Sequence, residues 1–241
     1  MLTNSKAIVL HTTKYGETKL FVDLFSELYG RMTMVALTGS RNRKKNRSNY
    51  FQPLSIIEVE FDLRPGVSMQ TIKEVRIATP LASIQFNPYK LSISIFIAEF
   101  MLHSLKNEQT DYRLFSYIEN SIIWLDSANK DYSNFHLIFM THISHLLGIS
   151  PNMESFSPGC IFDMREGCFT MLLPTHSDVL KTDESAVLNL LMRLNYRTMR
   201  LLKLSHTERN RCTAGILKYY RLHIPNFPEL KSFSIMQELF S

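Results

Sequence analysis

The 241-residue sequence has few of the residues that mark disulfide-rich or fibrous proteins. It contains 8 glycines, 9 prolines and only 3 cysteines, at positions 160, 168 and 212. An odd number of cysteines in a chain of this size does not suggest a disulfide framework, and we expect reduced thiols. With 45% hydrophobic and 20% charged residues, the composition is typical of a soluble globular protein.

Long apolar runs are also lacking. Residues 1–6 show no charged segment followed by an apolar run, and no stretch reaches the roughly 18 apolar residues that a membrane-spanning helix needs. The sequence therefore predicts a cytoplasmic protein without a membrane partner.

The sequence motifs of common enzymes are missing as well. There is no Walker loop, no GxGxxG, no HExxH and no nucleophile elbow. Asp163 and Glu166 lie close together in a turn-like stretch, where solvated carboxylates are expected and a nuclease pair is the alternative. We predict a protein with no catalytic residues and no cofactor.

A zinc site is not expected either. His136, His142 and His145 fall on one predicted helix, and the last two are one turn apart. Cys160 and Cys168, however, are eight residues apart, and neither belongs to the CxxC pair that structural zinc sites usually contain. We therefore predict no bound metal and interpret the histidines as partly buried polar residues.

What is present is an uneven distribution of charge. Residues 1–81 contain 12 of the 27 Lys and Arg residues but only 7 of the 22 Asp and Glu residues, so the net charge of +5 comes from this third of the chain. Such an asymmetry indicates contact with a polyanion such as nucleic acid, with chance variation as the alternative.

The same third has the pattern of a small barrel. Five segments rich in β-branched and aromatic residues, separated by turn signals, predict strands at 6–13, 19–25, 31–37, 52–63 and 69–77. The fourth alternates Ile57, Val59 and Phe61 with acidic residues, so its outer face should repel phosphate. Five strands in about 75 residues are typical of an OB-fold.

The pattern becomes helical after this region. Asn87-Pro88 is a helix start, and apolar residues then recur at helical steps at positions 91, 95, 98, 102 and 105. Further helices are predicted at 111–125, 135–147, 184–204 and 206–222. We predict an α+β protein with an OB-like DNA-binding domain at 1–81 and an all-helical domain at 82–241.

A basic run is the sharpest local feature. Its cations stand in a stretch with no acidic residue between Glu27 and Glu58, at Arg41, Arg43, Lys44, Lys45 and Arg47. Such a run can follow a phosphate backbone without reading base edges, and a solvated surface loop is the alternative. Tyr15, Tyr29 and Tyr50 could stack on bases, whereas Phe51 is expected in the core.

Two further sets of cations are predicted on helices. Arg193, Arg197 and Arg200 are spaced to share one helix face beside leucines, and a second set at positions 211, 218 and 221 does the same. Such a face can bind an acidic peptide with an apolar end, or it can simply be solvated.

Several motifs resemble the RecO family over most of the chain. In the barrel region they are Lys6-Ala7-Ile8-Val9-Leu10, Tyr15-Gly16-Glu17, a strand ending in Phe25, and Tyr29-Gly30-Arg31. Farther on they are Phe139, Ile143 and Leu147-Gly148 followed by Pro151, and at the end Leu230-Lys231-Ser232 with Glu238-Leu239-Phe240. Arg31 and Tyr15 join the basic run as expected DNA contacts.

The resemblance implies a mediator of recombinational DNA repair rather than an enzyme. It implies binding of single- and double-stranded DNA, annealing of complementary strands and, together with RecR, loading of RecA. It also implies docking of the acidic C-terminal tail of single-stranded-DNA-binding protein on the helical domain. Rival interpretations are an RNA-binding barrel protein of translation and a metal-dependent nuclease.

The sequence departs from the family in one place. Many members have two CxxC pairs after the helix that ends at Leu147, whereas here only Cys168 lies near the expected positions. We predict a zinc-free excursion at about residues 151–175, in which Phe156, Ile161, Phe162 and Phe169 form an apolar cluster in place of a metal.

Overall fold

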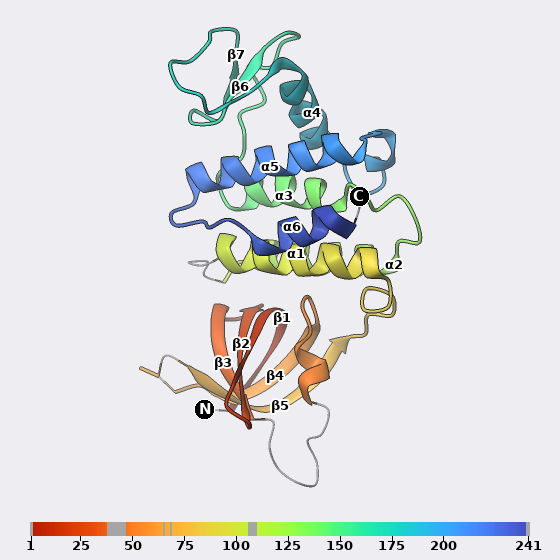
Figure 1. Ribbon diagram of the computed structural model, residues 1–241. Coiled ribbons are helices and arrows are strands. Elements are labelled where there is room, and N and C mark those ends of the chain that lie inside the picture. Colours follow the sequence, from red (N-terminus) through yellow and green to blue (C-terminus); the bar gives the residue numbers. More distant parts are fainter. Residues whose placement is uncertain (1, 38–46, 65, 68, 106–109, 240–241) are drawn as a thin grey trace. The chain divides into compact units, whose positions relative to one another are not determined.

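A computed structural model describes residues 2–37, 47–64, 66–67, 69–105 and 110–239 (Figure 1). The chain forms two compact units, and each has its own core. Unit 1 contains the residues up to Ser127 together with Leu230–Leu239, and unit 2 contains Ala128–Glu229. The expected division into domains at residue 81 stays a prediction.

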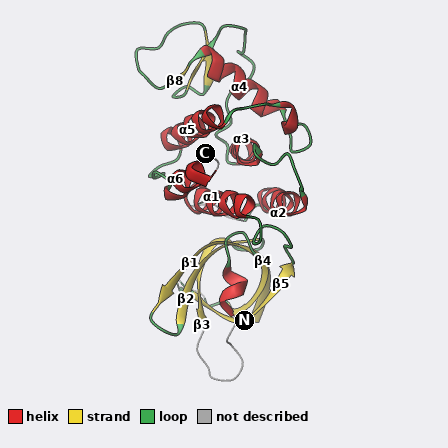
Figure 2. Ribbon diagram, turned by 45° about the vertical axis from the view of Figure 1, so that its right-hand side comes forward, coloured by secondary structure: helices red, strands yellow, loops and turns green. Residues whose placement is uncertain are grey.

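Unit 1 begins with a closed five-stranded barrel, which confirms the predicted fold class (Figure 2). Neighbouring strands follow the order β1-β2-β3-β5-β4, with antiparallel pairing except between β3 and β5. The strands are β1 (Leu2–Tyr15), β2 (Lys19–Ser26), β3 (Gly30–Leu37), β4 (Ile56–Asp62) and β5 (Gln70–Thr79).

The predicted alternation of β4 is confirmed. Ile57, Val59 and Phe61 are completely buried in the barrel, and Glu58 and the other acidic residues of the strand lie outside. The outer face is partly neutralised by ion pairs from β5, in which Arg76 binds Glu58 and Lys73 binds Asp62, both at 2.7 Å.

The predicted start of this strand was wrong. Residues 52–55 are not in β4, and Arg47–Phe51 form a short 3-10 helix, η1. Pro53 has no amide proton to donate to a ladder, and Leu54 has a positive φ of 62°, so the chain turns before the strand begins.

Three helices complete unit 1. They are α1 (Pro88–Ser104), α2 (Tyr112–Ser127) and α6 (Lys231–Leu239). Asn87 caps α1 as predicted, because its side chain accepts from the amides of Tyr89 and Lys90. The sequence analysis did not predict α6, whose first amides are bound by the carboxylate of Glu99.

The predicted apolar stripe of α1 is only partly correct, because Ala98 and Leu105 are buried and the other three residues are not. Leu91 and Leu102 are only partly buried and Ile95 is 37% exposed, whereas Phe96 and Phe100 are fully buried. The helix packs against both β1 and α6, and apolar residues surround it, so their spacing does not single out one buried face.

Unit 2 is a helical bundle with a small β-excursion. Its helices are α3 (Phe135–Leu146), α4 (Thr182–Arg193), the 3-10 helix η2 (Met199–Leu201) and α5 (His206–His223). Ser205 and Glu208 form the predicted capping box of α5. The excursion contains β6 (Ile161–Asp163), β7 (Cys168–Thr170) and β8 (Val179–Leu180), which pair in the order β7-β6-β8.

The predicted helix at 184–204 was wrong in its second half. It ends at Arg193, and Leu194 is extended. The side-chain oxygen of Asn195 then accepts from the amides of Arg197 and Thr198, at 2.9 and 3.1 Å. This local turn competes with continuation of the helix, which is a common effect of asparagine.

The excursion is held by the predicted aromatic residues. Phe169 contacts Phe156 and Phe162, with ring centroids 5.1 and 5.0 Å apart, and Phe162 also contacts Tyr219 of α5 at 5.7 Å. Phe162 and Phe169 are buried, which confirms an apolar cluster at this position. No helix among the residues that the model describes is long and apolar enough to span a membrane.

Candidate nucleic-acid interface

The basic run connects β3 to η1. Arg41, Arg43, Lys44 and Lys45 lie outside the described residues, and Arg47 is the first residue of η1. The run therefore follows Leu37, the last residue of β3, and leads directly to Asn49 and Tyr50.

Arg31 is held in a network on the outer face of the barrel. Its Nη2 lies 3.1 Å from Asp23 Oδ1, its Nη1 donates to the carbonyl of Met32, and its side chain is only 14% exposed. Thr33 Oγ1 donates to the same Asp23 oxygen at 2.6 Å. The charge of Arg31 is thus balanced by Asp23, and it is less available to phosphate than a free arginine.

Tyr15 lies at the end of β1 on an exposed aromatic patch. It is 61% exposed, and its ring lies 5.1 Å from that of Phe21 on β2. Lys19 pairs with Tyr15 on one side and with Leu37 on the other. Tyr15, Lys19, Phe21 and Leu37 thus form an outer barrel surface, here termed the aromatic face, at the point where the chain enters the basic run.

Lys19 and Phe21 were not predicted from the sequence as members of this surface. The signal was present in the two-residue alternation of β2, in which Leu20 and Val22 are buried and Lys19, Phe21 and Asp23 face outward.

Of the other aromatic residues singled out in the sequence, Tyr29 and Phe51 have structural roles. The Tyr29 hydroxyl shares a hydrogen bond of 2.8 Å with Thr3, and its ring packs edge-on against Phe61. Phe51 is buried, as predicted. Tyr50 is half-buried against the barrel core and lines a surface groove.

A second barrel groove is acidic. Its lining includes Glu58, Glu60 and Glu74, with Arg76 as the only cation among its described lining residues. Because carboxylates repel phosphate, this groove is unsuitable for nucleic acid, as the alternation of β4 had predicted.

The three arginines proposed as a partner site do not share a helix face. Arg193 ends α4, Arg197 lies in the following turn and Arg200 lies in η2, and all three are exposed. Leu188, Leu191, Leu194 and Leu202, which were expected beside the arginines, are buried. Leu201, beside Arg200, is 66% exposed.

A hollow in unit 2 contains one of these arginines. Arg200 lines it together with Lys203 and Arg209, which the sequence analysis had not selected. Arg209 is fixed there, because it donates to the side chain of Asn134 at 2.9 Å and to the carbonyl of Leu204 at 3.0 Å. Asp131 is the only acidic residue among the described lining residues.

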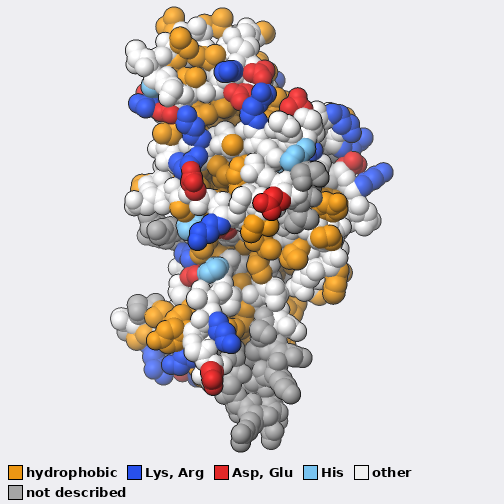
Figure 3. All heavy atoms as spheres, in the orientation of Figure 1, with side chains coloured by type: hydrophobic (Ala, Val, Ile, Leu, Met, Phe, Trp, Pro, Cys, Tyr) orange, Lys and Arg blue, Asp and Glu red, His pale blue; other side chains and the backbone are white. Residues whose placement is uncertain are grey.

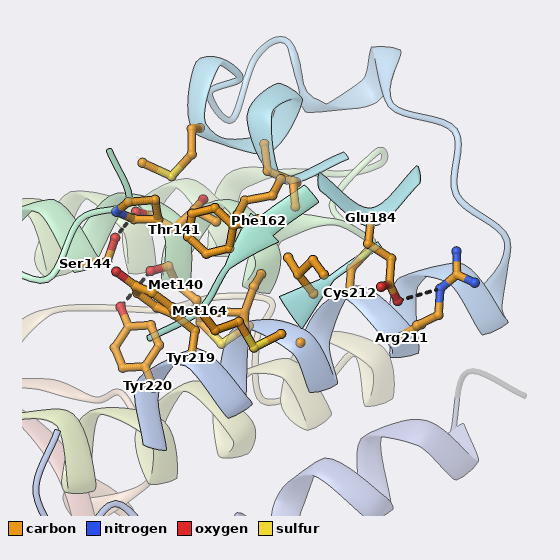
Figure 4. A pocket seen from close by; sticks show the side chains of 17 residues that line it. Met140, Thr141, Ser144, Phe162, Met164, Glu184, Arg211, Cys212, Tyr219 and Tyr220 are labelled. Atoms are coloured by element: carbon orange, nitrogen blue, oxygen red, sulfur yellow. Dashed lines mark hydrogen bonds and ion pairs between the residues drawn. The ribbon is translucent and has the colours of Figure 1, made fainter. Parts of the chain in front are cut away.

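A separate, mainly apolar pocket lies among α3, α4, α5 and the excursion (Figure 4). Its labelled cation, Arg211, is paired with Glu184 at 3.3 Å and with Asp183 at 2.8 Å. None of Arg193, Arg197 and Arg200 is among its lining residues. The pocket thus lacks free cations for an acidic ligand.

The second predicted set of helical cations is bound to acidic residues. Arg211 pairs as just described, Lys218 lies 2.8 Å from Asp178, and Arg221 lies 3.0 Å from Glu229. Hydrogen bonds from Lys218 and Arg165 lower the pKa of Asp178 to about 2. The charges of these cations are balanced by acidic partners, so they are not an open basic face.

The residues considered for metal binding have other contacts. His136 is buried and hydrogen-bonded to Thr213, and Asp163 accepts from the amides of Arg165 and Glu166 in a tight turn. Within the part of the chain that the model describes, no group of three or more His, Cys, Asp or Glu side chains is placed to hold a metal ion. The expected absence of metal stays a prediction.

The excursion also has an exposed apolar tip. Met171, Leu172 and Leu173, which follow β7, are 68%, 80% and 81% exposed. Figure 3 shows hydrophobic side chains gathered at this end of unit 2, around β6 and β7.

Comparison with known proteins covers nearly the whole chain. The family model "Recombination protein O N terminal" matches residues 1–81, and "Recombination protein O C terminal" matches residues 85–232. The DNA repair protein RecO of Phocaeicola vulgatus is 43% identical over 241 residues, and that of Bacteroides fragilis is 41% identical over 241 residues. That of Flavobacterium psychrophilum is 32% identical over 243 residues. Each alignment spans 100% of both chains.

Proposed function

Because the chain belongs to the RecO family of DNA repair proteins, we propose that it is a non-enzymatic recombination mediator of the cytoplasmic nucleoid. It binds single- and double-stranded DNA through the barrel and anneals complementary strands. With RecR it helps to load RecA onto DNA that is coated by single-stranded-DNA-binding protein.

The observation that carries this proposal is the aromatic face at the entrance of the basic run. Tyr15 offers an exposed ring for stacking beside the partly buried ring of Phe21, and Lys19 adds a cation next to Tyr15. The run itself adds five cations without an acidic neighbour. Stacking and phosphate neutralisation together are the usual means of binding single strands without sequence preference.

Annealing by such a surface needs no reacting side chain. Two strands repel each other through their phosphates, and cations that neutralise the phosphates lower this repulsion. Base pairing then supplies the driving force. The ion-paired acidic groove on β4 and β5 lies outside this path.

We also propose that unit 2 binds the acidic tail of single-stranded-DNA-binding protein. Arg193, Arg197 and Arg200 are exposed, and the hollow beside η2 adds Lys203 and Arg209. Exposed Leu201 gives an apolar contact next to these cations. Carboxylates and an apolar terminus are the ligand chemistry that such a surface complements.

The basic run is tested by replacing Arg43, Lys44 and Lys45 together with Ala. DNA affinity should fall to a similar extent for unrelated sequences, because phosphates carry no sequence information. The negative slope of log affinity against log salt should become shallower by roughly 0.7 to 0.9 for each lost phosphate contact. Titrations at several salt concentrations measure both effects.

The matched control removes cations from the acidic face. Lys73→Ala with Arg76→Ala breaks two ion pairs on the barrel and should leave the salt slope nearly unchanged. An unchanged slope and affinity in the triple variant would contradict the proposed contact. A strong preference for RNA at equal salt would favour the RNA-binding alternative, and substrate loss that requires a divalent metal would favour a nuclease.

A further inference from the structure

A neutral groove borders the end of the basic run in unit 1. It has a volume of about 350 Å³ and lies among η1, the start of β4, the end of β5 and the segment before α1. The described residues that line it carry no charge: Asn49, Tyr50, Ser55, Ile56, Ile77, Thr79, Pro80, Leu81 and Gln85. We call it the neutral groove, in contrast to the acidic groove on the same barrel.

One wall of this groove is held firmly to the barrel. Thr12 Oγ1 donates to the carbonyl of Phe51 at 3.0 Å, and the amide of Leu54 donates to the carbonyl of Val9 at 2.9 Å. The amide of Val9 in turn donates to the carbonyl of Ser55 at 3.0 Å. These bonds fix the backbone on the C-terminal side of Tyr50, whose half-buried ring packs against the core.

The opposite wall is fixed by a single carboxylate. Asp126 accepts from the amides of Ala82, Ser83 and Ile84, at distances of 2.8 to 2.9 Å. This arrangement holds the segment that bears Leu81 and Gln85. The groove is therefore preformed within unit 1, which lowers the entropic cost of placing a ligand in it.

The lining has the chemistry of a base-binding site. Tyr50, Ile77 and Leu81 supply flat or apolar surface, and Ile77 is 42% exposed. The exposed side-chain amides of Asn49 and Gln85 can donate to and accept from base edges. An aromatic ring beside such groups can stack a base of any sequence.

Charge distinguishes this groove from its acidic counterpart. No carboxylate lies among its described lining residues, so nothing there repels a phosphate backbone. Arg47 precedes Tyr50 by three residues, and the run of cations precedes Arg47 in the sequence. A strand whose phosphates contact these cations can place a base in the neutral groove.

We infer that the neutral groove is a subsite for an unpaired nucleobase of single-stranded DNA, with Tyr50 as its stacking residue. The inference rests on the proposed function and extends it. In the sequence, the basic run stands between Leu37 of the aromatic face and Asn49 of the neutral groove. In a duplex the base faces are already stacked, so the subsite favours single strands.

The experiment is photocrosslinking of the full-length protein to a single-stranded oligonucleotide that contains 5-iodouracil, followed by peptide mapping. We expect a crosslink within residues 47–55, the segment that contains Tyr50. Tyr50→Ala should weaken binding of the single strand by roughly 5-fold to 150-fold, the effect of losing one stacked base. Tyr50→Phe should keep the single-strand affinity of the unaltered protein. In the Tyr50→Ala variant, the affinity for duplex DNA should change by less than about 2-fold.

Two further variants separate recognition from folding. Ile77→Glu leaves Tyr50 in place, adds a carboxylate to the groove and should also reduce single-strand binding. Tyr112→Ala removes a tyrosine that is 70% exposed outside the groove and should have no effect.

The inference is overturned if Tyr50→Ala and Ile77→Glu both keep full single-strand affinity, a result expected if the groove instead binds a protein. It is also overturned if Tyr50→Ala lowers single-strand and duplex binding equally, because the ring would then only support the fold. If the unaltered protein binds neither single-stranded nor duplex DNA, the proposed function fails as well.

Discussion

His136 of unit 2 has a structural role. Its Nε2 lies 3.0 Å from Thr213 Oγ1, and that hydroxyl donates its one proton to the carbonyl of Arg209. Thr213 can therefore only accept from His136, so the imidazole donates through Nε2. Burial, together with the nearby charge of Arg209, lowers the pKa of His136 from 6.5 to about 3.

This shift predicts a loss of stability in mild acid. Between pH 6.5 and about 3 the unfolded chain binds a proton at this histidine and the folded chain does not. The free energy of unfolding should therefore fall as the pH decreases through this window, by at most about 1.4 kcal/mol per pH unit for one group. Urea titrations at pH 7, 6 and 5 measure the slope.

His136→Gln provides the comparison, since glutamine can still donate to Thr213. The variant should be less stable at pH 7, yet it should lose less stability between pH 7 and pH 5 than the unaltered protein. Parallel pH profiles for the two proteins would mean that His136 is not responsible.

At the scale of elements, the five barrel strands and the helices α1, α2, α3 and α5 were predicted close to their observed bounds, whereas β6, β7, β8 and α6 were not predicted. The five barrel strands were found because buried and exposed residues alternate, as in β4, and turns separate them clearly. The buried face of α1 was only partly predicted because apolar residues surround the helix. The end of α4 depends on a side-chain turn at Asn195 and not on hydrophobic spacing.

The candidate sites could be predicted only where their residues follow a local pattern in the sequence. Lys19 and Phe21 could have been found from the alternation of β2. The neutral groove could not, because its walls come from η1, β5 and the segment before α1, and only the fold brings them together. The ion pairs of Arg211 with Asp183 and of Lys218 with Asp178 also join residues that are distant in sequence.

The segment from α4 to η2 carries the prediction for the partner site. Arg197→Glu together with Arg200→Glu should abolish binding of an acidic tail peptide in a fluorescence anisotropy titration, because the new carboxylates repel those of the peptide. Both side chains are exposed, so the fold should be preserved. Binding of bare DNA should remain nearly intact.

Arg221→Glu is the matched charge reversal elsewhere in unit 2, where Arg221 pairs with Glu229. It should leave peptide binding almost unchanged. If the double variant loses peptide binding and DNA binding together, the arginines belong to the DNA path, and the proposed partner site is wrong.

In the whole molecule, DNA contacts are proposed for unit 1 and partner contacts for unit 2. The net positive charge comes from residues 1–81, which contain the aromatic face, the basic run and most of the lining of the neutral groove. Unit 2 keeps many of its cations in ion pairs and leaves a small exposed set at the end of α4 and in η2. Strand binding and partner binding can therefore be altered independently.

Annealing of complementary single strands coated by single-stranded-DNA-binding protein tests the central claim most directly, measured with and without RecR. We expect the protein to accelerate annealing without a nucleotide and RecR to alter that rate. The triple variant of Arg43, Lys44 and Lys45 should be strongly impaired. No acceleration of annealing by the unaltered protein, with or without RecR, would contradict the account.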